Sequence, residues 1–482
     1  MIFMLKRALT IIILWIPALL DGQERALNKL LSDSSMISAS VSICILNAST
    51  GETVCEYNPE ESLMPASVLK LLTSAAAIEL LGPGYCFKTR IGYTGSLNKT
   101  TGLLKGDIVI KGGGDPSLGS QYFKDHYGNF LEDWVTSIKK LGIKKIEGRI
   151  ITDDTRYDNQ PVPPKWIWED IGNYYGAGSY GLSVSDNMFE IHFRTSGDST
   201  IPEITKIVPD YSGYDLTNRL IASGNDDNGY IFAAPYANQG WISGTIPVYS
   251  DDFVLKASIP DPPLFLARHL DALLDSAGIP VSGPPATQRL INNSYESQTG
   301  LIAEVISPPL SQIIEVLNHE SVNLFAEHLL KEMGKIFRNS GTTAAGIDVL
   351  YRFLEDAGIN VTGIFLEDGS GMSPMNAITS QGLAGILMFM RNRSASFTLF
   401  YNSLPDAGKE GTLKTSFKDP AFYSNLKAKS GSMTRVRSYA GYFKAGSGNE
   451  MVFSIIINNF SGTSRRIISG IEEIILETIS DR

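Results

Sequence analysis

A serine and a lysine stand three positions apart near the start of an apolar segment, "PASVLKLLTSAAAIELLG" at residues 65–82. Pro65 near its beginning and Gly82 at its end predict a helix, on which Ser67 and Lys70 share one face. A serine hydroxyl becomes a nucleophile when a base lies beside it. A lysine can be that base if burial lowers its pKa. The alternative is a capping serine and a surface lysine, because this spacing is common by chance.

Two later segments carry residue types that could complete such a site. Ser321 and Asn323 precede or open the predicted helix "NLFAEHLL", where a hydroxyl and a carboxamide could relay a proton and hold a substrate amide. Ser321 could equally be a helix N-cap. Lys429, Ser430 and Gly431 lie in a predicted strand. A lysine and a hydroxyl can bind a carboxylate, and glycine allows close backbone approach, whereas the alternative is a solvated strand edge.

Taken in order, these three segments resemble the S-x-x-K, S-x-N and K-T-G motifs of penicillin-binding proteins and serine β-lactamases. The long separation between Ser67 and Ser321 is unlike class A β-lactamases. It is similar to the low-molecular-mass class C penicillin-binding proteins, the D-alanyl-D-alanine carboxypeptidase/endopeptidase family. Ser430 stands where threonine is usual, and the hydroxyl is retained. Further segments that are similar to this family lie at residues 106–118, 168–178, 366–373 and 429–442.

The resemblance implies acyl transfer through a serine ester that water then hydrolyses. Ser67 would attack the carbonyl of the penultimate D-alanine, Lys70 would take its proton, and Ser321 would pass a proton to the departing amine. Lys429 would help to keep Lys70 unprotonated. The other implied roles are the substrate amide for Asn323, the terminal carboxylate for Lys429 and Ser430, close approach at Gly431, and oxyanion-binding N–H groups from Ser67 and Ser432.

The implied substrates are peptidoglycan stem peptides, and β-lactams would acylate Ser67 as covalent inhibitors. A carboxypeptidase trims the terminal D-alanine, whereas an endopeptidase cuts the cross-link to a diamino acid. Trp168 and Asp170 would reach over the cleft, where an acidic group could pair with the ammonium of a diaminopimelate. A structural salt bridge is the equal alternative for this acid. The chemistry needs no metal or organic cofactor.

Two other functions compete with this interpretation. A catalytically silent wall-binding scaffold would be marked by loss of Ser67, Lys70 or Lys429, and all three are present. A secreted β-lactamase-like hydrolase would use the same residues, but the long middle segment and its "GGGDP" stretch argue against it. A net charge of −10 without a dense Lys/Arg block argues against a nucleic-acid partner. Five scattered histidines and three cysteines without zinc-ligand spacing argue against a metal site.

The first residues are typical of a secretory signal. Lys6 and Arg7 precede an apolar stretch too short for a comfortable membrane span, so residues 1–22 are predicted to be a signal peptide. We therefore expect an exported protein of the periplasm or cell-wall space, soluble after cleavage, with at most a loose association with membrane or wall. An uncleaved anchor is the alternative. Cys44 and Cys55 flank a predicted hairpin turn, where they could face each other or be two buried small hydrophobes.

The expected fold class is α/β (α+β), a penicillin-binding/serine β-lactamase-like transpeptidase domain with a large β-rich insertion. Residues 23–86 and 306–482 would form one discontinuous catalytic domain. Residues 87–305, with short strands and Gly/Asp turns, would form one or two inserted β-rich domains. The last segment places isoleucines on one helix face, and we expect that face to pack against a sheet.

Overall fold

The computed structural model describes residues 22–211, 213–291 and 300–480. The predicted signal peptide, residues 1–22, lies outside the described residues except for Gly22, which opens the first helix. Within the described ranges, no helix combines the length and the apolar character needed to cross a membrane.

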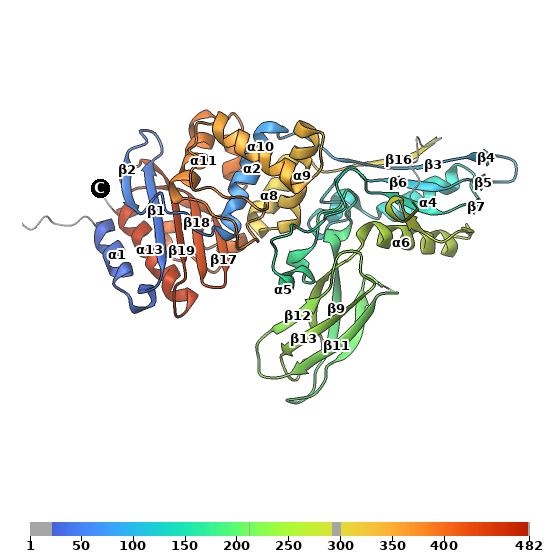
Figure 1. Cartoon of the computed structure of the whole chain (residues 1–482), viewed down its shortest axis with the longest axis horizontal. Coiled ribbons are helices and arrows are strands. Elements are labelled where there is room, and N and C mark those ends of the chain that lie inside the picture. The colour runs from blue at the N-terminus through green and yellow to red at the C-terminus, as the bar shows by residue number, and fades with distance from the viewer. Residues whose placement is uncertain (1–21, 212, 292–299, 481–482) are drawn as a thin grey trace, which may run out of the picture.

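A five-stranded antiparallel sheet joins the two ends of the chain. Its strands lie in the order β17-β18-β19-β1-β2, so the C-terminal hairpins pair directly with the first strand. One face is covered by the first and last helices, which pack against each other (Figure 1). The bounds are α1 (Gly22–Leu31), η1 (Ser34–Met36), β1 (Ser40–Asn47), β2 (Thr53–Tyr57), β17 (Leu426–Met433), β18 (Val436–Lys444), β19 (Glu450–Asn458) and α13 (Ser464–Ser480).

The expected packing of the C-terminal helix is confirmed. Ile467, Ile471, Ile474 and Ile475 of α13 are fully buried in one apolar cluster with residues of the sheet. Because these positions recur at helical spacing, burying them on one side leaves the polar residues of the helix toward solvent.

A group of helices covers the other face of the sheet. Its centre is α2, in which every residue from Lys70 to Ile78 is buried by the surrounding elements. The helix predicted from Pro65 instead begins with a 3₁₀ turn that carries Ser67, and regular α-helix starts only at Lys70. The bounds are η2 (Ala66–Leu69), α2 (Lys70–Leu80), α8 (Leu310–Glu320), α9 (Asn323–Arg338), α10 (Thr343–Asp356), α11 (Ser380–Arg393) and α12 (Phe397–Asn402). Two short 3₁₀ turns, η6 (Gly411–Leu413) and η7 (Pro420–Phe422), instead bury Leu413 and Phe422 in the apolar cluster of α13.

In the middle of the chain, the residues that the structure describes form four small sheets around an apolar cluster of their own. The first of these sheets has the order β15-β8-β6-β3-β16. The bounds of its strands are β3 (Lys88–Tyr93), β6 (Ile108–Lys111), β8 (Ile150–Asp153), β15 (Ala286–Thr287) and β16 (Gly300–Ile306), and those of a second sheet are β4 (Ser96–Asn98), β5 (Leu103–Lys105) and β7 (Lys145–Glu147).

The other two sheets, called the outer sheets below, form a lobe at the bottom of the view in Figure 1, away from β4, β5 and β7 at the right-hand end. Their bounds are β9 (Met188–Arg194), β10 (Glu203–Val208) and β14 (Phe253–Ser258), then β11 (Asp215–Ala222), β12 (Asn228–Phe232) and β13 (Gln239–Ile246). The accompanying helices are η3 (Gln121–Phe123), α3 (Lys124–Tyr127), α4 (Phe130–Lys140), α5 (Trp168–Ile171), η4 (Tyr174–Gly176), η5 (Ser185–Asn187), α6 (Pro262–Ser276) and α7 (Gln288–Ile291).

The two ends of this middle part lie side by side. Lys88, at the start of β3, pairs with Ile306, at the end of β16. A segment whose ends meet in one antiparallel pair can be inserted into a host domain without separating the host's own elements. The pairing supports the division into residues 23–86 with 306–482 and an inserted part at 87–305, which stays a prediction.

Cys44 and Cys55 are two buried small hydrophobic residues and do not face each other, which is the second of the two alternatives. Cys44 pairs in register with Glu56, whereas Cys55 pairs with Ile45, so the two thiols point to opposite faces of the sheet. Both are buried and free. Cys86 is also free and is partly exposed.

Candidate active site

The turn that carries Ser67 is held against the edge strand β17. Ala66 has a left-handed φ of +50°, which turns the chain into η2. The Ser438 hydroxyl donates to the carbonyl of Pro65 at 2.5 Å. A Cβ on Gly431 would lie 2.6 Å from that carbonyl and 3.0 Å from the backbone nitrogen of Ser67. Gly431 is therefore required here because no side chain fits between β17 and the serine turn.

Lys70 lies under Ser67, fully buried, with three oxygen atoms around its amine. Its Nζ lies 2.9 Å from the Ser67 Oγ, 2.6 Å from the Asn323 Oδ1 and 2.7 Å from the carbonyl oxygen of Ser370. The carboxamide and carbonyl oxygens can only accept hydrogen bonds. In the neutral amine, both N–H groups therefore donate to these two oxygens, and the lone pair is left facing the serine hydroxyl.

The electrostatics allow that neutral form near physiological pH. Burial lowers the pKa of Lys70 to about 7, although the carboxyls of Asp368 and Glu327 oppose the shift. Glu327 is itself fully buried and accepts the backbone N–H groups of Gly369 and Ser370. Burial beside Asp368 raises the pKa of Glu327. In its protonated form, Glu327 stabilises the charged form of Lys70 less. Burial, rather than Lys429, is the largest cause of the Lys70 shift.

Ser321 and Lys429 form a second serine–lysine pair. The Lys429 Nζ donates to the Ser321 Oγ at 2.9 Å and to the carbonyl of Ser430 at 2.9 Å. Ser321 joins α8 to α9 in a left-handed conformation, with φ +59°, and does not act as an N-cap. Burial, and then the charge of Lys70, hold the pKa of Lys429 well below its usual range. The Ser430 hydroxyl donates to Thr412 Oγ1 at 2.8 Å.

The sequence-predicted residues of the three motifs therefore come together from β17, η2, α2 and the α8–α9 junction. Ser432 follows on β17 and is exposed. Asn323 is more constrained than a free substrate ligand, because its Nδ2 donates to the carbonyl of Tyr175 at 2.8 Å while its Oδ1 accepts from Lys70. The carboxamide thus orients Lys70 in this structure.

The two residues predicted from the inserted part occupy different places. The Tyr175 hydroxyl donates to Asp170 Oδ1 at 3.2 Å, and Tyr175 is the residue whose carbonyl holds Asn323. Burial raises the pKa of Asp170. In the described part of the chain, the acid has no ion pair, which disfavours the structural salt bridge. Trp168 is 47% exposed and packs near Phe232 and Trp241 of the small outer sheet.

The sequence interpretation missed the buried acids that support the site. Asp368 accepts Trp166 Nε1 at 2.8 Å and the backbone N–H groups of Gly371 and Ser373. These contacts shape the loop whose Ser370 carbonyl meets Lys70. In the sequence, the segment at 366–373 is distinguished only by its similarity to the family. For Glu327, the available signal was an acid surrounded by apolar residues on the predicted helix.

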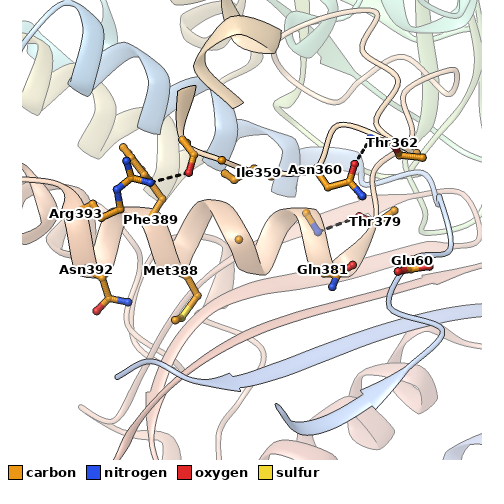
Figure 2. Close-up of a pocket in the computed structure, with 15 residues that line it drawn as sticks. Glu60, Ile359, Asn360, Thr362, Thr379, Gln381, Met388, Phe389, Asn392 and Arg393 are labelled. Atoms are coloured by element: carbon orange, nitrogen blue, oxygen red, sulfur yellow. Dashed lines mark hydrogen bonds between the residues drawn. The ribbon is translucent and has the colours of Figure 1, made fainter. Parts of the chain in front are cut away.

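A hollow of about 650 Å³ lies elsewhere, between α11 and the loop at residues 357–363 (Figure 2). Its lining includes Met388 and Phe389, and Arg393 donates to the carbonyl of Ala357 there. None of the motif residues lines it. Across the described ranges, no group of three or more His, Cys, Asp or Glu side chains is arranged to hold a metal ion.

A serine activated by a buried lysine, on an antiparallel sheet covered by helices on both faces, defines the class of serine hydrolases that work through an acyl-enzyme. The chain belongs to the D-Ala-D-Ala carboxypeptidase 3 (S13) family, whose model matches residues 23–475. This finding confirms the family resemblance.

Individual relatives agree with the family assignment. A D-alanyl-D-alanine carboxypeptidase from Actinomadura sp. (strain R39) is 27% identical, over 92% of this chain and 84% of its own length. Penicillin binding protein 4 from Haemophilus influenzae has a similar structure, with a TM-score of 0.81 at 21% identity, over 95% of this chain and 99% of that one. Its complex with a novel β-lactam gives 0.75 at 20% identity, over 95% and 98%. The expected fold class is confirmed.

Proposed function

We propose that this protein is a serine-type D-Ala-D-Ala carboxypeptidase, a DD-endopeptidase, or both, and that it acts on peptidoglycan stem peptides. The observation that carries the proposal is the Lys70 amine, which is 2.9 Å from the Ser67 Oγ and has two carbonyl-type acceptors on its other sides. The family membership and the Actinomadura relative, named a D-alanyl-D-alanine carboxypeptidase, support the substrate class.

The proposed acylation step begins with proton transfer from the Ser67 hydroxyl to neutral Lys70. The Ser67 Oγ forms a bond to the carbonyl carbon of the penultimate D-alanine, and the carbonyl oxygen becomes an oxyanion. Backbone N–H groups of Ser67 and Ser432 would bind that oxyanion, and losing one such donor typically costs about 10²–10³-fold in rate. The C–N bond then breaks, and Ser321 relays the proton held by Lys70 to the departing amine, which leaves Lys70 neutral again.

The substrate's terminal carboxylate would bind at Lys429 and Ser430. Burial lowers the pKa of Lys429, so an arriving anion would favour its charged form, and binding and protonation would reinforce each other. Lys429 also contacts Ser321 Oγ, which connects the carboxylate site to the proton donor. Water attacks the resulting ester, and Lys70 can serve as the base again. Hydrolysis returns Ser67 to its free form and releases the shortened peptide.

Cross-link cleavage would use the same groups with a larger leaving peptide. We propose that Asp170 pairs with the ammonium of a diamino acid in the substrate, because two hydrogen bonds, one at each end of Tyr175, connect it to Asn323. Trp168 would contribute only from the edge, since it packs on the outer sheet.

We further propose export to the periplasm or cell-wall space through residues 1–22, because Lys6 and Arg7 precede an apolar stretch.

The test is intact-mass spectrometry after incubation with benzylpenicillin, using the wild type and Ser67→Ala. A lasting adduct of one penicillin on the wild type alone supports the acyl-serine mechanism. No adduct with intact drug would indicate a catalytically silent scaffold. No adduct with consumed drug would indicate a β-lactamase-like hydrolase. Release of D-alanine from a pentapeptide, or cleavage of cross-linked muropeptides, then distinguishes trimming from endopeptidase activity.

A further inference from the structure

A cavity of about 800 Å³ opens at the end of the β17–β18 hairpin, beside the strand that carries the predicted carboxylate site. Its lining holds two arginines, Arg435 and Arg437, together with several hydroxyl groups and Asn459. None of the described residues that line it is acidic. In a chain with a net charge of −10, a cavity with only positive charges is suited to an anion.

Arg435 is available to a ligand. It lies in the two-residue turn between Met433 and Val436, which are paired across the hairpin. Its φ of +58° is in the left-handed region that favours glycine, so an arginine here carries a conformational cost. Within the described ranges, its guanidinium has neither an ion pair nor a hydrogen bond, whereas its carbonyl accepts the N–H of Asn459 at 2.8 Å.

Arg437 connects the cavity to the reaction centre. Its guanidinium donates to the carbonyl of Val436 at 2.7 Å, to the Ser464 hydroxyl at 2.5 Å and to the Ser432 hydroxyl. Ser464 is the first residue of α13, a helix of 17 residues whose N-terminal end therefore borders the cavity. The helix dipole there also favours negative charge. Burial lowers the pKa of Arg437, and a bound anion would oppose that shift.

The direction of the substrate along β17 follows from the proposed function. Its terminal carboxylate would lie at Lys429 and Ser430, and its scissile carbonyl at Ser432. Continuing in the same direction, the earlier residues of the stem peptide run toward Thr434 and Arg435. Two extended residues span roughly 7 Å, and β17 ends at Met433, one residue after Ser432, so such a span passes the end of the strand at the turn of Thr434 and Arg435. A group two residues before the acyl D-alanine therefore arrives at the cavity.

We propose that this cavity binds a carboxylate that the stem peptide carries two residues before the acyl D-alanine, which is the free α-carboxylate of a γ-linked glutamate. This inference rests on the proposed function. It makes Arg435 a specificity-determining residue for stem peptides that keep this carboxylate, as opposed to those in which it is amidated. Arg435 would form the direct ion pair, while Arg437 would position the Ser432 end of the strand.

The experiment compares two pentapeptides that end in D-Ala-D-Ala and differ only at the γ-linked glutamate, which bears an α-carboxylate or an α-carboxamide. The measured quantity is kcat/KM for D-alanine release by the full-length mature protein. We expect the wild type to prefer the carboxylate by about fivefold, the range of an arginine–carboxylate pair near the surface. Arg435→Gly should reduce the ratio to about one, and Arg435→Lys should retain part of it.

The choice of variants separates binding from folding. Glycine at this φ removes strain, so Arg435→Gly should fold at least as well as the wild type, which a thermal melt checks. Arg352→Gln, at an exposed position of α10, removes one positive charge elsewhere and should keep the full ratio. Equal use of both peptides by the wild type, or an unchanged ratio in Arg435→Gly, overturns the cavity assignment. Cleavage of neither peptide overturns the proposed function, and the inference with it.

Discussion

Substituting Gly431 by alanine should disable acylation through the backbone of the serine turn. The new Cβ would lie 2.2 Å from the Ser438 Oγ, 2.6 Å from the Pro65 carbonyl oxygen and 3.0 Å from the Ser67 nitrogen. The Ser438 hydroxyl can rotate away, but it then loses its bond to Pro65. The carbonyl must retreat by about 0.8 Å to reach the 3.4 Å at which ordinary contact begins.

That retreat moves the turn that carries Ser67, whose hydroxyl lies 2.9 Å from the Lys70 amine. A misplacement of about 1 Å between reacting groups can cost about 10²-fold in rate. We therefore expect the second-order rate constant for acylation by benzylpenicillin to fall by about 10²-fold in Gly431→Ala. Timed quenching followed by intact-mass spectrometry measures that rate constant. Overpacking should also lower the free energy of unfolding by about 1–3 kcal/mol.

Gly148→Ala is the matched control for this loss of stability. Its Cβ would lie 2.0 Å from the carbonyl oxygen of Gly106, in the inserted part and away from the motif residues. It should lose similar stability and keep its acylation rate. A folded Gly431→Ala that acylates at the wild-type rate would refute the reasoning, and so would an equal loss of acylation in both variants.

Three further predictions concern charge. The acylation rate should rise with pH and reach half its maximum near pH 7. Burial lowers the pKa of Lys70 to about 7, and only the neutral amine accepts the serine proton. A rate that continues to rise to about pH 10, as for an ordinary lysine, would contradict this prediction. Glu332→Gln should lower the free energy of unfolding by about 3 kcal/mol, because it leaves the partly buried Arg156 without its charged partner, and urea denaturation measures it. Asp170→Asn should reduce kcat/KM for stem peptides with a free diamino-acid ammonium more than for their N-acetylated forms; equal reductions would show that Asp170 does not bind the ammonium.

The three motifs of the proposed site could be located in the sequence because the relation of their residues is local or chemically distinctive. The spacing of Ser67 and Lys70 places both on one face of a helical segment whatever surrounds it. The turn between them proved to be 3₁₀ rather than α, which a propensity argument cannot distinguish over four residues. The family resemblance identified the other two motifs. In the structure, the Lys429 Nζ lies 2.9 Å from the Ser321 Oγ.

The supporting residues could not be predicted because their partners are distant in sequence. The Ser370 carbonyl that completes the surroundings of Lys70 is 300 positions away from it, and a backbone carbonyl leaves no signature in the residue type. The need for glycine at position 431 depends on Pro65, which belongs to another element. Such requirements arise only when the sheet and the helices have packed.

The helix α9 connects these distant parts. Asn323 at its start contacts Lys70, and Glu327, one turn later, accepts the N–H groups of the loop whose carbonyl meets the same lysine. Farther along, buried Lys331 and Glu332 bind the inserted part through Asp158 and Arg156. One helix thus presents buried polar groups to the reaction centre and to the insertion.

The contact between Asn323 and Tyr175 gives this arrangement a consequence for the chemistry. A carboxamide can rotate to exchange its oxygen and nitrogen, and if Nδ2 faced Lys70 it would present N–H groups to an amine that needs acceptors. The Tyr175 carbonyl accepts from Nδ2 at 2.8 Å and so keeps the oxygen toward the lysine. Because Tyr175 belongs to residues 87–305, the predicted insertion helps to hold Lys70, the proposed base, in the orientation that leaves its lone pair for the proton of Ser67.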